Sequence, residues 1–183
     1  MLKIKQLKRK VREVKTALEA KVDDAQAKAQ LEQLSGQLHE TELEHYQLCV
    51  KNYPTDLSVK FEYALRLVAD KQYDQAIPLL QQAQKDPRRK IAAMSKVGFC
   101  FAEKGWLDDA IDVYTKAINS YEIKEDAVAK ELRYNLGRAY EQQGDIDKAL
   151  GVYRQIAQLD FAYKDVSQRV DRLRNAKKET DSQ

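Results

Sequence analysis

Two stretches of this sequence superimpose on each other without a gap. Residues 98–118 read GFCFAEKGWLDDAIDVYTKAI, and residues 137–157 read GRAYEQQGDIDKALGVYRQIA. At an offset of 39 residues, identical residues align: Gly98 with Gly137, Gly105 with Gly144 and Tyr114 with Tyr153. A third copy lies in YALRLVADKQYDQAIPLLQQA at residues 63–83, where Ala64 aligns with Gly98 at an offset of 34. Self-similarity at such a period predicts a repeat architecture.

Each copy has the pattern of two short helices. Apolar or small residues recur at i, i+3, i+4 and i+7 in two runs, and a glycine or a Lys-Gln-Tyr-Asp segment separates the runs. Gly98 and Gly137 have no Cβ, so we expect the second helix to approach them closely through Ala110 or Ala149. The second glycine of each copy is expected to end the first helix in the left-handed conformation that glycine adopts without strain.

This register of small and aromatic residues resembles the tetratricopeptide repeat family, in which a helix–turn–helix unit recurs about every 34 residues. The resemblance implies an all-α, right-handed superhelical solenoid of antiparallel helix pairs, with repeats at residues 57–90, 91–129 and 130–163. The middle repeat is longer, and we expect residues 119–126 to extend its second helix and widen the next turn. The blocks ELRYNLGRAYEQQG and IAQLDFAYKDVSQRVDRLR are similar to the C-terminal part of uncharacterised bacterial proteins of this family.

The segments that flank the repeats also have helical patterns. A long N-terminal helix is expected over residues 1–36, with a break at Ser35 and Gly36. Residues 37–56 are expected to form the second helix of a degenerate N-terminal repeat. At the other end we expect a capping helix over residues 164–176, because the last repeat of an array needs a cover with a polar outer face. A disordered tail is expected over residues 177–183.

The N-terminal helix combines basic charge with an apolar seam. Residues 1–15 contain seven Lys or Arg residues against Glu13 alone, a local charge of +6, whereas the rest of the chain sums to −3. The seam advances by three and four residues in turn: Ile4, Leu7, Val11, Val14 and Leu18. It is shorter than the three or four heptads that mark a coiled coil, so three roles stay open. The helix pairs with a second copy in a homodimer, packs on the chain's own repeats, or binds an anionic surface through residues 3–15.

Composition argues against several other classes. No apolar run approaches the length of a membrane span, and no apolar run follows the basic N-terminus as in a secretory signal. Cys49 and Cys100 are interpreted as buried thiols, so we expect a cytoplasmic protein, or the cytoplasmic part of a longer one. His39 and His45 fall on different helix faces, and no metal or other cofactor is expected. The sequence has neither a phosphate-binding loop nor an activated nucleophile, and we expect no enzyme.

The candidate site is therefore the groove that stacked repeats form. The family's groove positions correspond here to Phe61, Leu65, Ser95, Phe99, Tyr134 and Arg138. Because Phe61 and Leu65 replace the polar residues that grip a peptide's terminal carboxylate in some members, that clamp is absent. We expect a protein-interaction scaffold whose groove accepts a helical or extended apolar segment of another protein. No nucleic-acid partner is expected, because basic charge is not spread over a folded face.

Overall fold

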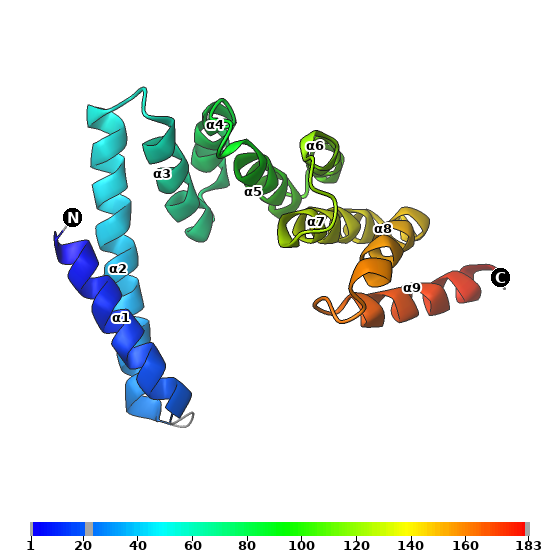
Figure 1. Ribbon diagram of the computed structural model, residues 1–183, viewed down its shortest axis with the longest axis horizontal. Helices are drawn as coiled ribbons and strands as arrows, with labels where there is room; N and C mark the ends of the chain where they lie inside the picture. Colours follow the sequence, from blue (N-terminus) through cyan, green and yellow to red (C-terminus); the bar gives the residue numbers. More distant parts are fainter. Residues whose placement is uncertain (1, 21–23, 182–183) are drawn as a thin grey trace. The chain divides into compact units, whose positions relative to one another are not determined.

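The computed structural model describes residues 2–20 and 24–181, which form nine helices and no strand (Figure 1). The all-α fold class is thereby confirmed for these residues. The chain divides into two compact units, Met1–Leu79 and Leu80–Gln183. The helices in chain order are α1 Leu2–Ala20, α2 Ala25–Asn52, α3 Leu57–Ala69, α4 Tyr73–Ala83, α5 Lys90–Glu103, α6 Leu107–Ser120, α7 Ala127–Gln143, α8 Ile146–Leu159 and α9 Val166–Asp181.

In the first unit α1 and α2 lie side by side as an antiparallel hairpin, and α2 also contacts α3 (Figure 1). The expected break at Ser35 and Gly36 is wrong, because α2 runs without interruption through both residues. A glycine inside a helix costs about 1 kcal/mol relative to alanine. The neighbouring Ala, Gln, Leu and Glu residues are strong helix formers, and together with the contact to α1 they offset that cost. The second helix begins at Ala25, and the side chain of Asp24 caps it by accepting a hydrogen bond from the Ala27 N–H at 2.9 Å.

A charged cluster joins α1, α2 and α3 of this unit. Glu42 on α2 is buried, and its carboxylate pairs with Lys8 of α1 at 2.7 Å and with Arg66 of α3 at 3.0 Å. Arg66 also pairs with Glu62 at 2.6 Å, and its guanidinium lies 4.6 Å from the centroid of the Tyr46 ring. Because Glu42 has partners on both neighbouring helices, it links α1 and α3 through α2.

The second unit contains two helix pairs and a final helix. Each helix from α5 to α9 packs on the next in the chain. Alanine and tyrosine on the second helix of each pair are fully buried: Ala110, Tyr114, Ala149 and Tyr153. Around them lie two apolar clusters, one that includes Met94, Leu132 and Leu136, and another that includes Ile156, Val166, Val170 and Leu173. The partly buried Tyr140 packs against both clusters and links the core of the repeats to that of the cap.

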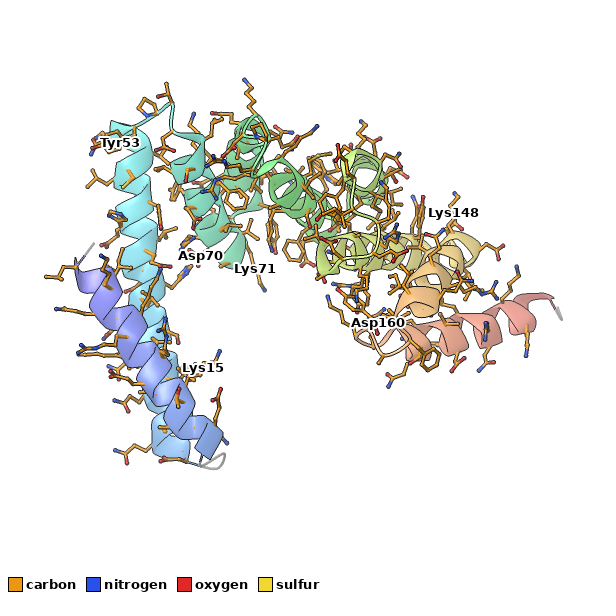
Figure 2. The ribbon with its side chains drawn as sticks, viewed as in Figure 1. Lys15, Tyr53, Asp70, Lys71, Lys148 and Asp160 are labelled. Atoms are coloured by element: carbon orange, nitrogen blue, oxygen red, sulfur yellow. The ribbon has the colours of Figure 1, made fainter. Side chains whose placement is uncertain are left out.

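The turns within the pairs follow the expected chemistry. Gly105 and Gly144 end α5 and α7 with φ angles of +77° and +85°, as the left-handed cap predicts. In the first copy Lys71 takes the same position with a φ of 59° (Figure 2). Asp145 then caps α8 by accepting a hydrogen bond from the Lys148 N–H at 3.0 Å.

One expectation about the second unit is right in part and another is wrong. The turn before α7 is wider, as expected, but α6 ends at Ser120 and has 14 residues, the same number as α8, so the second helix of this repeat is not longer. The expected disordered tail is helical, because α9 continues to Asp181 and Lys177 forms an ion pair with Asp147. Residues 182–183 lie outside the described part of the chain.

Candidate functional site

A groove of about 820 Å³ lies in the second unit between α5 and α7, the first helices of two consecutive repeats. The turn before α5, the loop before α7 and the segment before α9 complete its border. Its apolar lining includes Ile91, Ala92, Phe99, Val128, Leu132 and Tyr163. Leu132 is almost fully buried beneath the surface, whereas Val128 is exposed, so the groove has a firm apolar floor and an accessible apolar edge.

Four charged residues line the groove: Arg88, Lys96, Glu131 and Arg138. Among the residues that the structure describes, none of the three cations forms an ion pair. The ammonium of Lys96 lies 5.8 Å from the centroid of the Phe99 ring. The groove therefore places cationic side chains beside apolar ones.

Glu131 is already engaged within the protein. Its carboxylate accepts hydrogen bonds from Tyr163 Oη at 2.8 Å and from Lys164 Nζ, and a weaker one from Asn135 Nδ2 at 3.4 Å. Partial burial alone would raise the pKa of Glu131, but the hydrogen bonds from Lys164 and Tyr163 hold that pKa below its usual value. The acidic side chain that lines the groove is thus ionised, and the positive charge of Lys164 compensates its negative charge.

The loop at residues 121–126 forms one wall of the groove through Tyr121. Tyr121 Oη donates a hydrogen bond to Asp126 at 2.5 Å, and Asp126 caps α7 by accepting the Ala129 N–H at 2.8 Å. The hydrogen bond from Tyr121 lowers the pKa of Asp126. Arg133 on α7 donates to the Lys124 carbonyl at 2.6 Å, which fixes the other side of the loop. The extra residues of the middle repeat therefore form an ordered wall.

Tyr134 is not in the groove, contrary to expectation. It is 8% exposed, its hydroxyl donates to Asp165 at 2.7 Å, and its ring packs against Tyr153 and Tyr163. Arg169 of α9 lies 5.5 Å from the centroid of the same ring and pairs with Asp165 at 2.9 Å. Because the segment before α9 and α9 itself cover this part of the last repeat, the family's groove position becomes an internal contact of the cap.

Three of the six predicted groove residues do line the groove: Ser95, Phe99 and Arg138. Phe61 and Leu65 belong to α3 in the first unit. There Phe61 is buried, with 8% exposure, and Leu65 is partly buried. A groove role for Phe61 and Leu65 therefore stays a prediction.

The sequence reasoning missed Ile91, Val128 and Tyr163 as groove residues. Ile91 and Val128 lie in the first turn of α5 and α7, four residues before Ser95 and six residues before Tyr134. Tyr163 precedes α9, and it reaches the groove because its hydroxyl is held by Glu131 of α7. The helical period could have found Ile91, which stands one turn before a predicted groove residue, but not Val128, which does not.

The seam of the N-terminal helix is used within the chain. Ile4 and Leu7 are buried, and Val11, Val14 and Leu18 are half-buried, while α1 packs along α2. The sequence allowed packing on the repeats of residues 57–163, whereas in the structure α1 packs along α2, which precedes them. The outer face of α1 carries most of the basic residues as exposed side chains, Lys15 among them (Figure 2). Residues 21–23, where the seam loses its register, lie outside the described residues.

The histidines and cysteines make simple pairwise contacts. His39 Nε2 lies 2.5 Å from a carboxylate oxygen of Asp70, and His45 lies 3.5 Å from the Cys49 sulfur. Cys100 is buried in α5, and burial raises the pKa of its thiol to about 11, so it is a poor nucleophile at neutral pH. Within the described residues, no three His, Cys, Asp or Glu side chains are grouped as metal ligands. None of the described helices has both the length and the apolar composition to cross a bilayer.

The described helices thus form an all-α repeat solenoid, built from helix pairs that share one core with their neighbours. The family model of the tetratricopeptide repeat matches residues 131–163, the third repeat identified in the sequence. The resemblance to tetratricopeptide repeat proteins is confirmed by this match and by the shared fold. No curated protein matches the sequence.

Solved structures of tetratricopeptide proteins have the same fold. A crystal structure of MamA has a TM-score of 0.67 at 17% identity, over 80% of this chain and 83% of that one. TTC0263, a thermophilic protein from Thermus thermophilus, has a TM-score of 0.61 at 20% identity, over 89% and 88%. YrrB, described as having an unusual peptide-binding site, has a TM-score of 0.62 at 17% identity, over 90% and 84%.

Proposed function

We propose that this protein is a non-catalytic interaction scaffold that binds an apolar segment of another protein, helical or extended, between α5 and α7. The observation that carries the proposal is the groove of about 820 Å³, with Phe99 and Val128 on its accessible surface. Apolar surface that stays open to solvent on a folded protein favours a partner, because burying it is worth about 25 cal/mol per Å².

Two further observations support a peptide-sized partner. The groove lies between the first helices of consecutive repeats, and helices of this kind accept an amphipathic or extended segment along their length. YrrB, which shares the fold, is described as having a peptide-binding site, and the same use fits the groove of this chain. Both cysteines are free thiols, which is consistent with a reducing, cytoplasmic location for the interaction.

Site-specific cross-linking tests the proposal. A photoreactive residue at Ser95, which lines the groove, is compared with one at Gln155, which is exposed on α8 and does not line it. We expect a discrete cross-linked partner from position 95, lost in Val128→Glu and Phe99→Glu and retained in Phe161→Glu. Phe161 is 71% exposed and lies outside the groove, so it controls for a phenylalanine replaced by a charge.

Val128→Glu keeps the experiment informative if Phe99→Glu fails to fold, because Val128 is exposed and its substitution does not disturb the core. Cross-linking that persists in the folded Val128→Glu variant, or that is equal at positions 95 and 155, contradicts the groove proposal.

A second candidate function uses the outer face of α1. The seam of α1 packs on α2, and the exposed side chains of α1 include five cations: Lys3, Lys5, Lys10, Arg12 and Lys15. Such a face fits an anionic surface better than a second copy of the helix. Binding to anionic vesicles that weakens with added salt and disappears in a triple Lys3→Glu, Lys10→Glu, Lys15→Glu variant would support it. Salt-insensitive binding would contradict it.

A further inference from the structure

The cations of the groove come from three separate segments. Arg88 lies in the turn before α5, Lys96 lies in the middle of α5, and Arg138 lies in the second half of α7. Within the described residues these side chains have no ion-pair partner, although the second unit forms many ion pairs elsewhere. Glu103, which shares a shallow depression with Arg138, forms no ion pair with it. The groove therefore presents three positive charges without compensation from its own walls.

The acidic residue at the groove does not cancel these charges. Glu131 is held by Lys164 and Tyr163 from the segment before α9. Its charge is compensated by Lys164, which does not line the groove. An occupant thus meets an apolar floor flanked by cations, and a positively charged occupant would be repelled.

We propose that the segment bound in this groove carries Asp or Glu side chains between its apolar residues, so that several carboxylates face Arg88, Lys96 and Arg138. This inference rests on the proposed function and names the chemistry of its partner. The apolar residues of the segment contact Ile91, Phe99 and Val128, and its carboxylates satisfy the cations.

Side-chain carboxylates fit this arrangement better than a single terminal carboxylate. The three cations belong to three segments that border a groove of about 820 Å³, and one carboxylate has only two oxygens to offer. Carboxylates spaced along the bound segment can each meet a different cation. Amidation of the segment's C-terminus should therefore leave its binding unchanged.

The probes for this inference are three synthetic peptides of twelve residues, each acetylated and amidated. They share the same Leu and Phe residues. All remaining positions are Glu in the first peptide, Gln in the second and Lys in the third. Binding to the full chain is measured by calorimetry at low and physiological salt. We expect the Glu peptide to bind at least about tenfold tighter than the Gln peptide, with a preference that declines as salt rises, and the Lys peptide to bind weakest.

Paired variants locate the effect. The double variant Lys96→Gln, Arg138→Gln should reduce the preference for the Glu peptide to less than about threefold, while the Gln peptide binds as before. The matched control Lys3→Gln, Lys10→Gln removes two exposed cations from α1 and should leave the preference intact.

Each contrary result overturns the inference in a distinct way. Equal binding of the Glu and Gln peptides, abolished by Val128→Glu, refutes the acidic partner while the groove function stands. A preference that survives the groove variant and vanishes in the α1 control places the binding on the N-terminal helix. Failure of all three peptides to bind refutes the inference, and the cross-linking at Ser95 then decides the groove function separately. A dimer in sedimentation that Val128→Glu dissociates identifies a second copy as the occupant, which also refutes it.

Discussion

The ring of Tyr153 lies directly against Gly137: a Cβ added to Gly137 would stand 2.7 Å from Cε1 of the tyrosine. The preceding repeat has the same relationship, with 2.8 Å between a Cβ on Gly98 and Cε1 of Tyr114. Both tyrosines are fully buried on the second helix of their pair. The first helix therefore needs glycine at this position because a large aromatic ring occupies the space that a side chain would fill.

We expect Gly137→Ala to destabilise the protein by about 1–3 kcal/mol, since the added methyl group forces a buried ring to move in a close-packed core. The free energy of unfolding from urea titrations, followed by circular dichroism, measures the change. Gly98→Ala should have an effect of similar size, because its neighbour is the same atom of the equivalent tyrosine.

Gly151→Ala is the matched control for this substitution. Gly151 lies inside α8 with no heavy atom within 4 Å of a built Cβ, so alanine there should stabilise the helix by about 0.5–1 kcal/mol. Equal effects of the two substitutions would show that helix propensity, and not the tyrosine ring, decides the outcome at Gly137.

Much of the repeat fold was predictable, because some of its positions accept only glycine. Glycine at a close helix contact and at a left-handed turn leaves a mark in the sequence, and both marks recur at an offset of 39 residues. The sequence did not identify the nearest neighbour of each glycine: Ala110 and Ala149 are buried, as a close helix contact requires, but the atoms nearest to the glycines belong to the rings of Tyr114 and Tyr153. Spacing identifies which helix faces a glycine, whereas the direction of a long side chain decides which residue fills the gap.

The candidate site was less predictable than the fold. Ser95 and Tyr134 occupy equivalent positions in successive repeats, yet Ser95 lines the groove and Tyr134 packs under the cap. The difference depends on the helix that comes after each repeat, because α9 and the segment before it bring Asp165, Tyr163 and Arg169 onto Tyr134. A pattern read within one repeat does not contain that contact. The helix break expected at Gly36 failed for a related reason, since tertiary packing overrides a weak local signal.

The turn glycine Gly144 should respond to substitution through its backbone alone. Its φ is +85°, and no heavy atom lies within 4 Å of a built Cβ. We therefore expect Gly144→Ala to cost about 1 kcal/mol, and Gly144→Asn to cost less, because asparagine tolerates the left-handed region better than alanine. Thermal unfolding of the two variants shows which of them is less stable. If alanine and asparagine were equally destabilising, the left-handed backbone would not be the cause.

Glu42 should make the stability of the first unit depend on pH. Burial alone would raise its pKa, but Lys8 and Arg66 together hold the pKa below the ordinary value of 4.5. A carboxyl with a lowered pKa in the folded state stabilises the fold fully above its unfolded pKa, and this contribution is lost as pH falls through the folded pKa. We expect Glu42→Gln to lower the free energy of unfolding by about 1–3 kcal/mol at pH 7, since it leaves two cations without their shared partner.

Below about pH 4.5 the difference between wild type and Glu42→Gln should shrink, because acid protonates the same carboxyl in the wild type. Urea titrations at pH 7, 4 and 3 follow this convergence. The control is Glu44→Gln, an exposed neighbour on α2, which should leave the pH dependence unchanged. A constant difference at every pH would mean that the ion pairs of Glu42 contribute nothing to folding.

The last prediction concerns the role of the N-terminal seam, the apolar residues of α1 that pack on α2. Leu7 is buried and Leu2 is 73% exposed on the same helix, so Leu→Asp at the two positions compares one substitution inside and outside the contact. Burial of a leucine contributes about 2 kcal/mol, more than the 1.4 kcal/mol that changes an equilibrium tenfold. Leu7→Asp should therefore raise amide hydrogen exchange in residues 2–20 by at least about tenfold, while the second unit keeps its protection.

Leu2→Asp should leave exchange unchanged, and sedimentation should give the mass of one chain for the wild type, for both variants and for a shortened chain that begins at residue 24. These outcomes follow if the seam belongs to α2 of its own chain. If Leu7→Asp or the truncation instead halved the sedimenting mass, the seam would hold two copies together. The contact between α1 and α2 would then have to open, or be shared between chains, when the dimer forms.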